Sequence, residues 1–116
     1  GIKDKDELPW YVYGKNISKN EIYVCQGVDN QLLYTENITL DKIHWINKLK
    51  KFKNLDCLVQ IRHRHKPVKC NLEFNEGFSV TFDEEIRGVA PGQSAVFYKD
   101  NLCLGGGVIE GRNNDL

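Results

Sequence analysis

The feature that most constrains the fold is a succession of short apolar or alternating runs, spaced roughly ten residues apart and separated by turn residues. β-branched and aromatic residues are frequent in these runs, and helical periodicity is weak throughout the chain. Many short strands at this spacing are typical of a small β-barrel or sandwich, and a barrel also removes exposed strand edges. We therefore predict an all-β chain whose main unit is a small closed or nearly closed β-barrel.

The first two expected strands form a hairpin across a polar turn. Residues 35–39 are polar and are expected to join two units, so we place a domain boundary near Glu36. Residues 1–36 then form a short β-hairpin unit, and residues 37–116 form the barrel. Residues 47–56 fit either a short helical turn or a lysine-rich loop. The expected strands are 10–13, 21–26, 31–34, 43–46, 57–66, 68–74, 78–82, 86–89, 94–98 and 102–104.

Residues 82–109 are the most informative stretch. Asp100 and Asn101 stand between two β-prone runs and predict a hairpin turn, and Pro91-Gly92 predicts a chain reversal. The glycines 105–107 predict a tight bend or a backbone that approaches another closely. A phosphate-binding loop is the alternative, but it requires a helix after the glycines, and more strand follows instead. The acids 83–85 are expected in a solvated turn, and residues 110–116 in a polar tail.

Charge is unevenly distributed along a chain whose total charge is zero. Residues 1–41 carry a net charge of −3, residues 42–70 carry +8, and residues 71–116 carry −5. A basic centre is a candidate contact surface for a polyanion, and a solvated lysine-rich loop explains it equally well.

Within the basic centre, residues 57–66 predict a strand in which Val59 and Ile61 face the core. Successive side chains of a strand point to opposite faces, so Arg62, Arg64 and Lys66 are expected to project together on the other side. Four lysines that precede this strand are expected to form a looser cationic loop, namely Lys48, Lys50, Lys51 and Lys53.

Other chemistry is weakly supported. Four widely spaced cysteines, at positions 25, 57, 70 and 103, lack metal or redox spacing and predict reduced thiols in a core. His63 and His65 lack converging partners, so we predict no metal site. No nucleophile or acid–base constellation is present, and no apolar run is long enough to cross a membrane. The chain begins with Gly and contains no Met, so we expect a processed or truncated product.

Seven segments, in order, carry a resemblance to a known family. Two short stretches within these segments, Asn30-Gln31 and residues 65–67, differ from the sequence pattern of that family. The matching segments are PWYV with Gly14-Lys15, YV with Gln26-Gly27 and Leu32–Tyr34, HW at 44–45, IRHR at 61–64 with Cys70, FDE at 82–84, RGVAPGQSAVFY at 87–98, and CLGGG at 103–107. On these residues the chain resembles the C-terminal end of the tRNA-specific 2-thiouridylases.

The resemblance implies that the barrel is similar to the second domain of elongation factor Tu, and that residues 1–36 end a central β domain. It also implies a longer cytoplasmic parent enzyme that thiolates the wobble uridine of tRNA, using ATP and Mg²⁺ in an N-terminal PP-loop domain and a persulfide supplied by a sulfur-donor protein. No cysteine here matches the catalytic pair, so the chain alone is expected to be inactive and to hold no cofactor.

The resemblance gives the basic residues a role as contacts to tRNA phosphates, and Arg87 and Gln93 become possible contacts to tRNA or to the neighbouring domain. The alternative is a structural domain that packs on the ATP-binding domain and closes it without touching tRNA.

Overall fold

The computed structural model describes residues 8–47, 52–62 and 65–112. Nearly all regular structure in these ranges is β, and one short 3-10 helix is the exception. The elements are β1 Trp10–Asn16, β2 Glu21–Gln26, η1 Gln31–Leu33, β3 Tyr34–Leu40, β4 His44–Trp45, β5 Asn54–Gln60, β6 Val68–Phe74, β7 Phe78–Arg87, β8 Ser94–Lys99 and β9 Leu102–Arg112.

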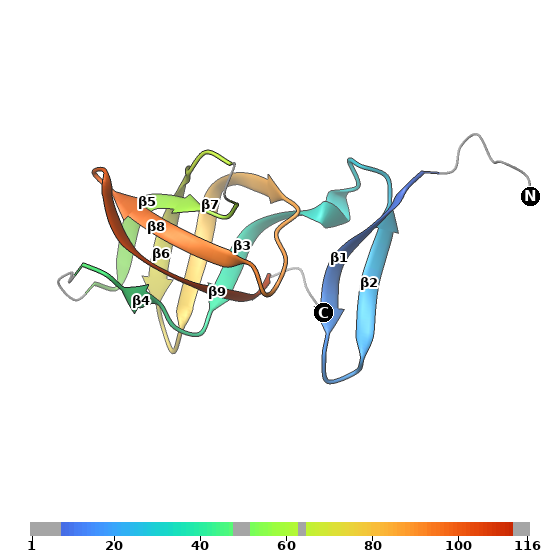
Figure 1. The fold of residues 1–116 in the computed structure, drawn as a ribbon, viewed down its shortest axis with the longest axis horizontal. Coiled ribbons are helices and arrows are strands. Elements are labelled where there is room, and N and C mark those ends of the chain that lie inside the picture. Colours follow the sequence, from blue (N-terminus) through green and yellow to red (C-terminus); the bar gives the residue numbers. More distant parts are fainter. Residues whose placement is uncertain (1–7, 48–51, 63–64, 113–116) are drawn as a thin grey trace, which may run out of the picture.

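The strands form two separate antiparallel sheets (Figure 1). β1 and β2 pair only with each other, and η1 connects this hairpin to the larger sheet. The larger sheet has the order β3-β7-β6-β5-β8-β9-β4, and β3 also pairs with β9. That last pairing closes six strands into a barrel, with the short β4 added along β9. The predicted all-β fold with a closed barrel and a preceding hairpin is confirmed.

The barrel interior is filled by the alternate apolar side chains of its strands. Phe97 is the largest fully buried side chain, and it lies with Val59, Leu72 and Val80 in one continuous core. The predicted inward direction of Val59 and Ile61 is confirmed by their exposed fractions of 0% and 8%. No helix among the described residues is long and apolar enough to cross a membrane.

The predicted turns at both ends of the last hairpin are confirmed. Asp100 and Asn101 have φ angles of +52° and +66°, the left-handed pair that a two-residue hairpin turn requires. A turn at Pro91 and Gly92 precedes β8. The glycines 105–107 are part of β9 rather than a bend, but the predicted close backbone approach is confirmed. A Cβ atom at Gly105 would lie 2.2 Å from the carbonyl oxygen of His44.

Outside the basic segment, four sequence-based assignments are wrong in detail. The run 31–34 was expected to be a strand, but η1 occupies 31–33 because the Asn30 side chain accepts a hydrogen bond from the Leu32 amide (2.9 Å) and caps a helical turn. The polar run 35–39 is no linker, because it belongs to β3, where Ile38 is fully buried. The division into residues 1–36 and 37–116 stays a prediction, although the larger sheet begins at Tyr34.

The other two errors concern polar residues near the hairpin–barrel junction. The acids 83–85 lie exposed within β7 rather than in a turn, opposite a register shift between Thr35 and Asn37. This irregularity absorbs the extra residues without breaking the pairing. Residues 110–112 continue β9 because β3 pairs with them as far as Arg112, so the expected polar tail does not begin at 110.

The close approach at Gly105 leads to a stability prediction. Gly105→Ala adds a methyl group that collides with the His44 backbone, at a φ of +151° that L residues rarely adopt. We expect the free energy of unfolding to fall by about 3 kcal/mol, measured by urea denaturation.

Gly92→Ala is the matched control, because Gly92 also has a positive φ (+94°) but no atom lies within 4 Å of its added Cβ. It should lose only the backbone cost of about 1–2 kcal/mol. Equal losses in the two variants would contradict the packing explanation.

Candidate functional site at the hairpin–barrel junction

One face of the β1–β2 hairpin presents tyrosines to the barrel. Tyr11 and Tyr13 alternate with the exposed Trp10 and Val12, so the two tyrosines share a face of β1 and are half-buried. The Tyr13 ring also lies beside Tyr23 of β2, with ring centroids 6.0 Å apart. This aromatic face provides flat, polarisable surfaces on which guanidinium groups can lie.

Two arginines at strand ends of the barrel meet this face. Arg87 ends β7, donates its Nε hydrogen to the Val28 carbonyl (2.8 Å) and lies 5.3 Å from the centre of the Tyr11 ring. Arg112 is the last residue of β9, donates to the Leu32 carbonyl (3.3 Å) and lies 5.7 Å from the Tyr13 ring centre. Each guanidinium therefore joins a hydrogen bond to a main-chain carbonyl with a cation–π contact.

A third arginine supports the same corner from the barrel side. The Gly88 amide donates to the Leu33 carbonyl of η1 (2.8 Å), and the Gly88 carbonyl accepts a hydrogen bond from Arg62 Nη2 (2.5 Å). Arg62, Arg87 and Arg112 come from three separate segments of the chain, and together they surround the connection between hairpin and barrel.

The predicted tRNA contacts were expected on one strand over residues 57–66, but the structure ends that strand earlier. β5 ends at Gln60, and a turn follows in which the His65 amide donates to the Arg62 carbonyl (3.0 Å). The Gln60 side chain donates to the His65 carbonyl (2.8 Å) and supports this turn. Arg62 and Lys66 thus lie beyond the end of β5, so the expectation that alternation along one strand aligns them is wrong.

Burial and position separate the described candidates further. Lys66 is exposed shortly before β6, whereas Arg62 is partly buried against Gly88. Lys53 precedes β5 at its opposite end, roughly 25–30 Å of extended chain away from Arg62. Four further candidates lie outside the described residues, namely Lys48, Lys50, Lys51 and Arg64.

The two remaining candidates lie near the junction. Arg87 contacts the hairpin through Val28 and Tyr11, as described above. The Gln93 side chain accepts a hydrogen bond from the Ala90 amide (3.1 Å), and its carbonyl accepts one from the Ile109 amide (2.8 Å). Gln93 therefore stabilises the turn before β8. A contact of either residue to tRNA stays a prediction.

Sequence reasoning missed Arg112 and the tyrosines. Arg112 is only 4% exposed, although it sits in a glycine-, asparagine- and acid-rich end that predicted a polar tail. The period-2 alternation of aromatic residues in β1 was the available signal, because Tyr11 and Tyr13 must share a face. The partner of that face could not be inferred from the local sequence.

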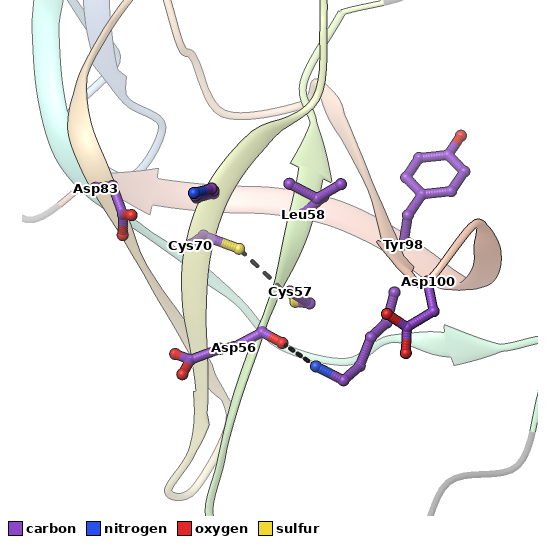
Figure 2. A pocket seen from close by; sticks show the side chains of 9 residues that line it. Asp56, Cys57, Leu58, Cys70, Asp83, Tyr98 and Asp100 are labelled. Atoms are coloured by element: carbon purple, nitrogen blue, oxygen red, sulfur yellow. Dashed lines mark hydrogen bonds between the residues drawn. The ribbon is translucent and has the colours of Figure 1, made fainter.

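A second cluster lies away from the junction, in a shallow pocket of about 560 Å³ (Figure 2). Cys57 of β5 and Cys70 of β6 are direct cross-strand partners, and their sulfur atoms are 3.8 Å apart. The hydrogen bond with Cys70 lowers the pKa of the Cys57 thiol, and nearby Lys99 acts in the same direction. The same hydrogen bond, together with burial, raises the pKa of Cys70.

The potential metal ligands and the glycine run among the described residues bear on ion and phosphate binding. They include no cluster of three or more His, Cys, Asp or Glu side chains arranged to hold an ion. The glycines 105–107 lie inside β9, where added Cβ atoms would meet main-chain oxygens of His44, Ala95 and Lys42, so no open cradle for phosphate exists there.

Fold and junction together define a six-stranded antiparallel barrel domain with an attached hairpin. The chain belongs to the family described as the aminomethyltransferase beta-barrel domain, whose sequence model matches residues 35–109. The match begins inside β3 and ends inside β9, so it covers the closed barrel and excludes the β1–β2 hairpin.

Relatives with longer chains extend the similarity to the hairpin. A protein of Idiomarina loihiensis named tRNA-specific 2-thiouridylase MnmA is 38% identical over the whole chain, which covers 32% of that relative. Proteins of the same name from Pectobacterium carotovorum and Buchnera aphidicola are 40% and 41% identical over 97% of the chain, and 31% of each is covered. The resemblance to the tRNA-specific 2-thiouridylases is confirmed, and the chain spans about a third of the length of these relatives.

The junction geometry leads to a prediction. Arg87→Ala removes one charge-assisted hydrogen bond and one cation–π contact, which together stabilise the hairpin by about 1 kcal/mol. We expect amide hydrogen exchange in β1 and β2 to accelerate about fivefold while exchange in β5 and β6 stays unchanged.

Lys99→Ala is the control, since Lys99 donates to the Asp56 carbonyl (2.8 Å) within the barrel. It should leave exchange in the hairpin unchanged. Uniform acceleration across both sheets in the Arg87 variant would show that the residue supports the whole fold rather than the junction.

Proposed function

We propose that this chain is the tRNA-recognising part of a longer tRNA-uridine 2-sulfurtransferase. The observation that carries the proposal is the identity of 38–41% to proteins named tRNA-specific 2-thiouridylase, which extends over hairpin and barrel alike. The barrel is proposed to bind the tRNA backbone while a separate part of the same protein carries out the reaction.

The reaction we propose for the longer protein is thiolation of the wobble uridine in the cytoplasm. It uses ATP with Mg²⁺ in a PP-loop domain and sulfur delivered as a persulfide by a donor protein. In this proposal the chain contributes binding and positioning, and it is inactive on its own.

The charge distribution supports binding to tRNA phosphates. Residues 42–70 carry a net charge of +8 in a neutral chain, and the exposed side chains of Lys53 and Lys66 lie near opposite ends of β5. Two separated cationic positions suit an extended phosphate backbone better than a small anion. Such contacts position a nucleic acid without reading its sequence.

The alternative function is a structural domain that packs on the catalytic domain without touching tRNA. One observation favours it, because Arg62 and Arg87 already donate to main-chain carbonyls of this chain. Deleting residues 37–116 from the longer protein separates the two functions. Loss of tRNA binding with intact ATP binding supports recognition, and loss of ATP binding supports the structural function.

A salt titration tests recognition directly. For the doubly substituted variant Lys53→Ala plus Lys66→Ala, we expect three- to tenfold weaker binding of unmodified tRNA. We also expect the slope of log affinity against log salt to fall in magnitude by about 0.7–0.9 for each lost phosphate contact. Binding is measured by fluorescence anisotropy at several salt concentrations.

Lys19→Ala is the matched control, because Lys19 is exposed in the turn between β1 and β2, outside the basic segment. Affinity that does not depend on salt, or an equal loss in the Lys19 variant, would overturn the assignment of the basic segment to tRNA.

A further inference from the structure

The two cysteines of β5 and β6 are buried in the core, and their side chains are also placed as a disulfide would need them. Cys57 and Cys70 are directly opposite in the antiparallel ladder. Opposed residues in such a ladder have Cα atoms about 4.5–5.5 Å apart, which falls within the range that a disulfide spans. Their sulfurs are already 3.8 Å apart, so bond formation needs only a small rotation of the side chains.

The pair is also reachable from a surface pocket. Figure 2 shows both thiols among the side chains that line the pocket of about 560 Å³, with Asp56, Leu58 and Tyr98 around them. The exposed fractions of Cys57 and Cys70 are 8% and 4%, so both are largely covered. Both cysteines therefore border the pocket, and their small exposed fractions favour access by a small reagent over access by a protein surface.

The two thiols differ in their readiness to ionise. The hydrogen bond between the two sulfurs lowers the pKa of the Cys57 thiol, and the nearby cation of Lys99 acts in the same direction. A thiolate is the attacking form in disulfide exchange, and a neighbouring thiol is needed to resolve the mixed disulfide. The pair thus contains an attacking and a resolving cysteine.

We propose that Cys57 and Cys70 form a reversible dithiol–disulfide site that exchanges with small-molecule disulfides entering the pocket. The Cys57 thiolate attacks one sulfur of the small disulfide, whose S–S bond breaks and releases one thiolate. Cys70, after losing its proton, attacks the Cys57 sulfur and releases the second thiolate. Two electrons pass from the protein to the small disulfide, and the two protein protons end on the two released thiols.

The expected consequence is a cross-link that closes residues 57–70 into a loop containing Arg62 and Lys66. The site lies on strands already joined to β7 and β8 on their outer sides, so oxidation is expected to leave the fold intact. This inference does not depend on the proposed function, because it concerns the barrel alone.

The test equilibrates the purified chain with glutathione redox buffers of increasing oxidised fraction, followed by acid quenching, alkylation and peptide mass spectrometry. We expect a product two hydrogens lighter, in which the peptides of Cys57 and Cys70 are linked, and dithiothreitol should reverse it. Cys70→Ser should trap glutathione on Cys57, since the resolving thiol is gone.

The other two cysteines serve as internal controls. Cys103 is partly exposed and Cys25 is buried in the hairpin sheet. Circular dichroism establishes that the Ser variant is folded, and the unsubstituted protein decides the outcome if it is not. The proposal is overturned if Cys57 and Cys70 both stay reduced while Cys103 becomes glutathionylated, or if they join only after urea is added.

Discussion

The pairing of β3 with β9 is the interaction on which the rest of the structure depends. β3 pairs with β7 on its other side, so this contact turns an open sheet into a closed barrel and leaves the core without an edge. Closure brings Ile38 and Leu40 of β3 into one core with Phe97. It also forces β9 to run past β3, β4 and β8, and only glycine leaves room for the main-chain oxygens that crowd residues 105–107.

Barrel closure also determines how the hairpin is attached. β3 pairs with Arg87 at Tyr34, its first residue, and with Arg112 at Ile38. β7 and β9 are antiparallel to β3, so both arginines end strands that run toward the start of β3, where η1 leads to the hairpin. Their guanidinium groups then reach the carbonyls of Leu32 and Val28. A main-chain carbonyl and a tyrosine face are weak partners singly, but their combination at two positions fixes the hairpin. The carbonyl contacts do not depend on the side chains at Val28 and Leu32, whereas the ring contacts require Tyr11 and Tyr13.

The sequence predicts the strands that alternate clearly and that lie between strong turns. The bounds of β2 and β6 and the turn at Asp100-Asn101 follow from local residues alone. It fails where a distant strand supplies the partner, as in the polar run of β3 and in residues 110–112, because closure is not a local property. It also fails beyond Gln60, where β5 ends and the Gln60 side chain donates to the His65 carbonyl.

The sequence predicted which residues of the candidate site are charged, but it did not predict what their side chains contact. Local charge identifies a basic segment, yet the structure divides its described members by what each side chain contacts. Arg62 is held against Gly88, whereas Lys66 is exposed. An arginine that donates to one carbonyl keeps further N–H donors, so its structural role and a phosphate contact are compatible. Lys66 has no such structural role within the described residues, so its charge is open to the proposed phosphate contact.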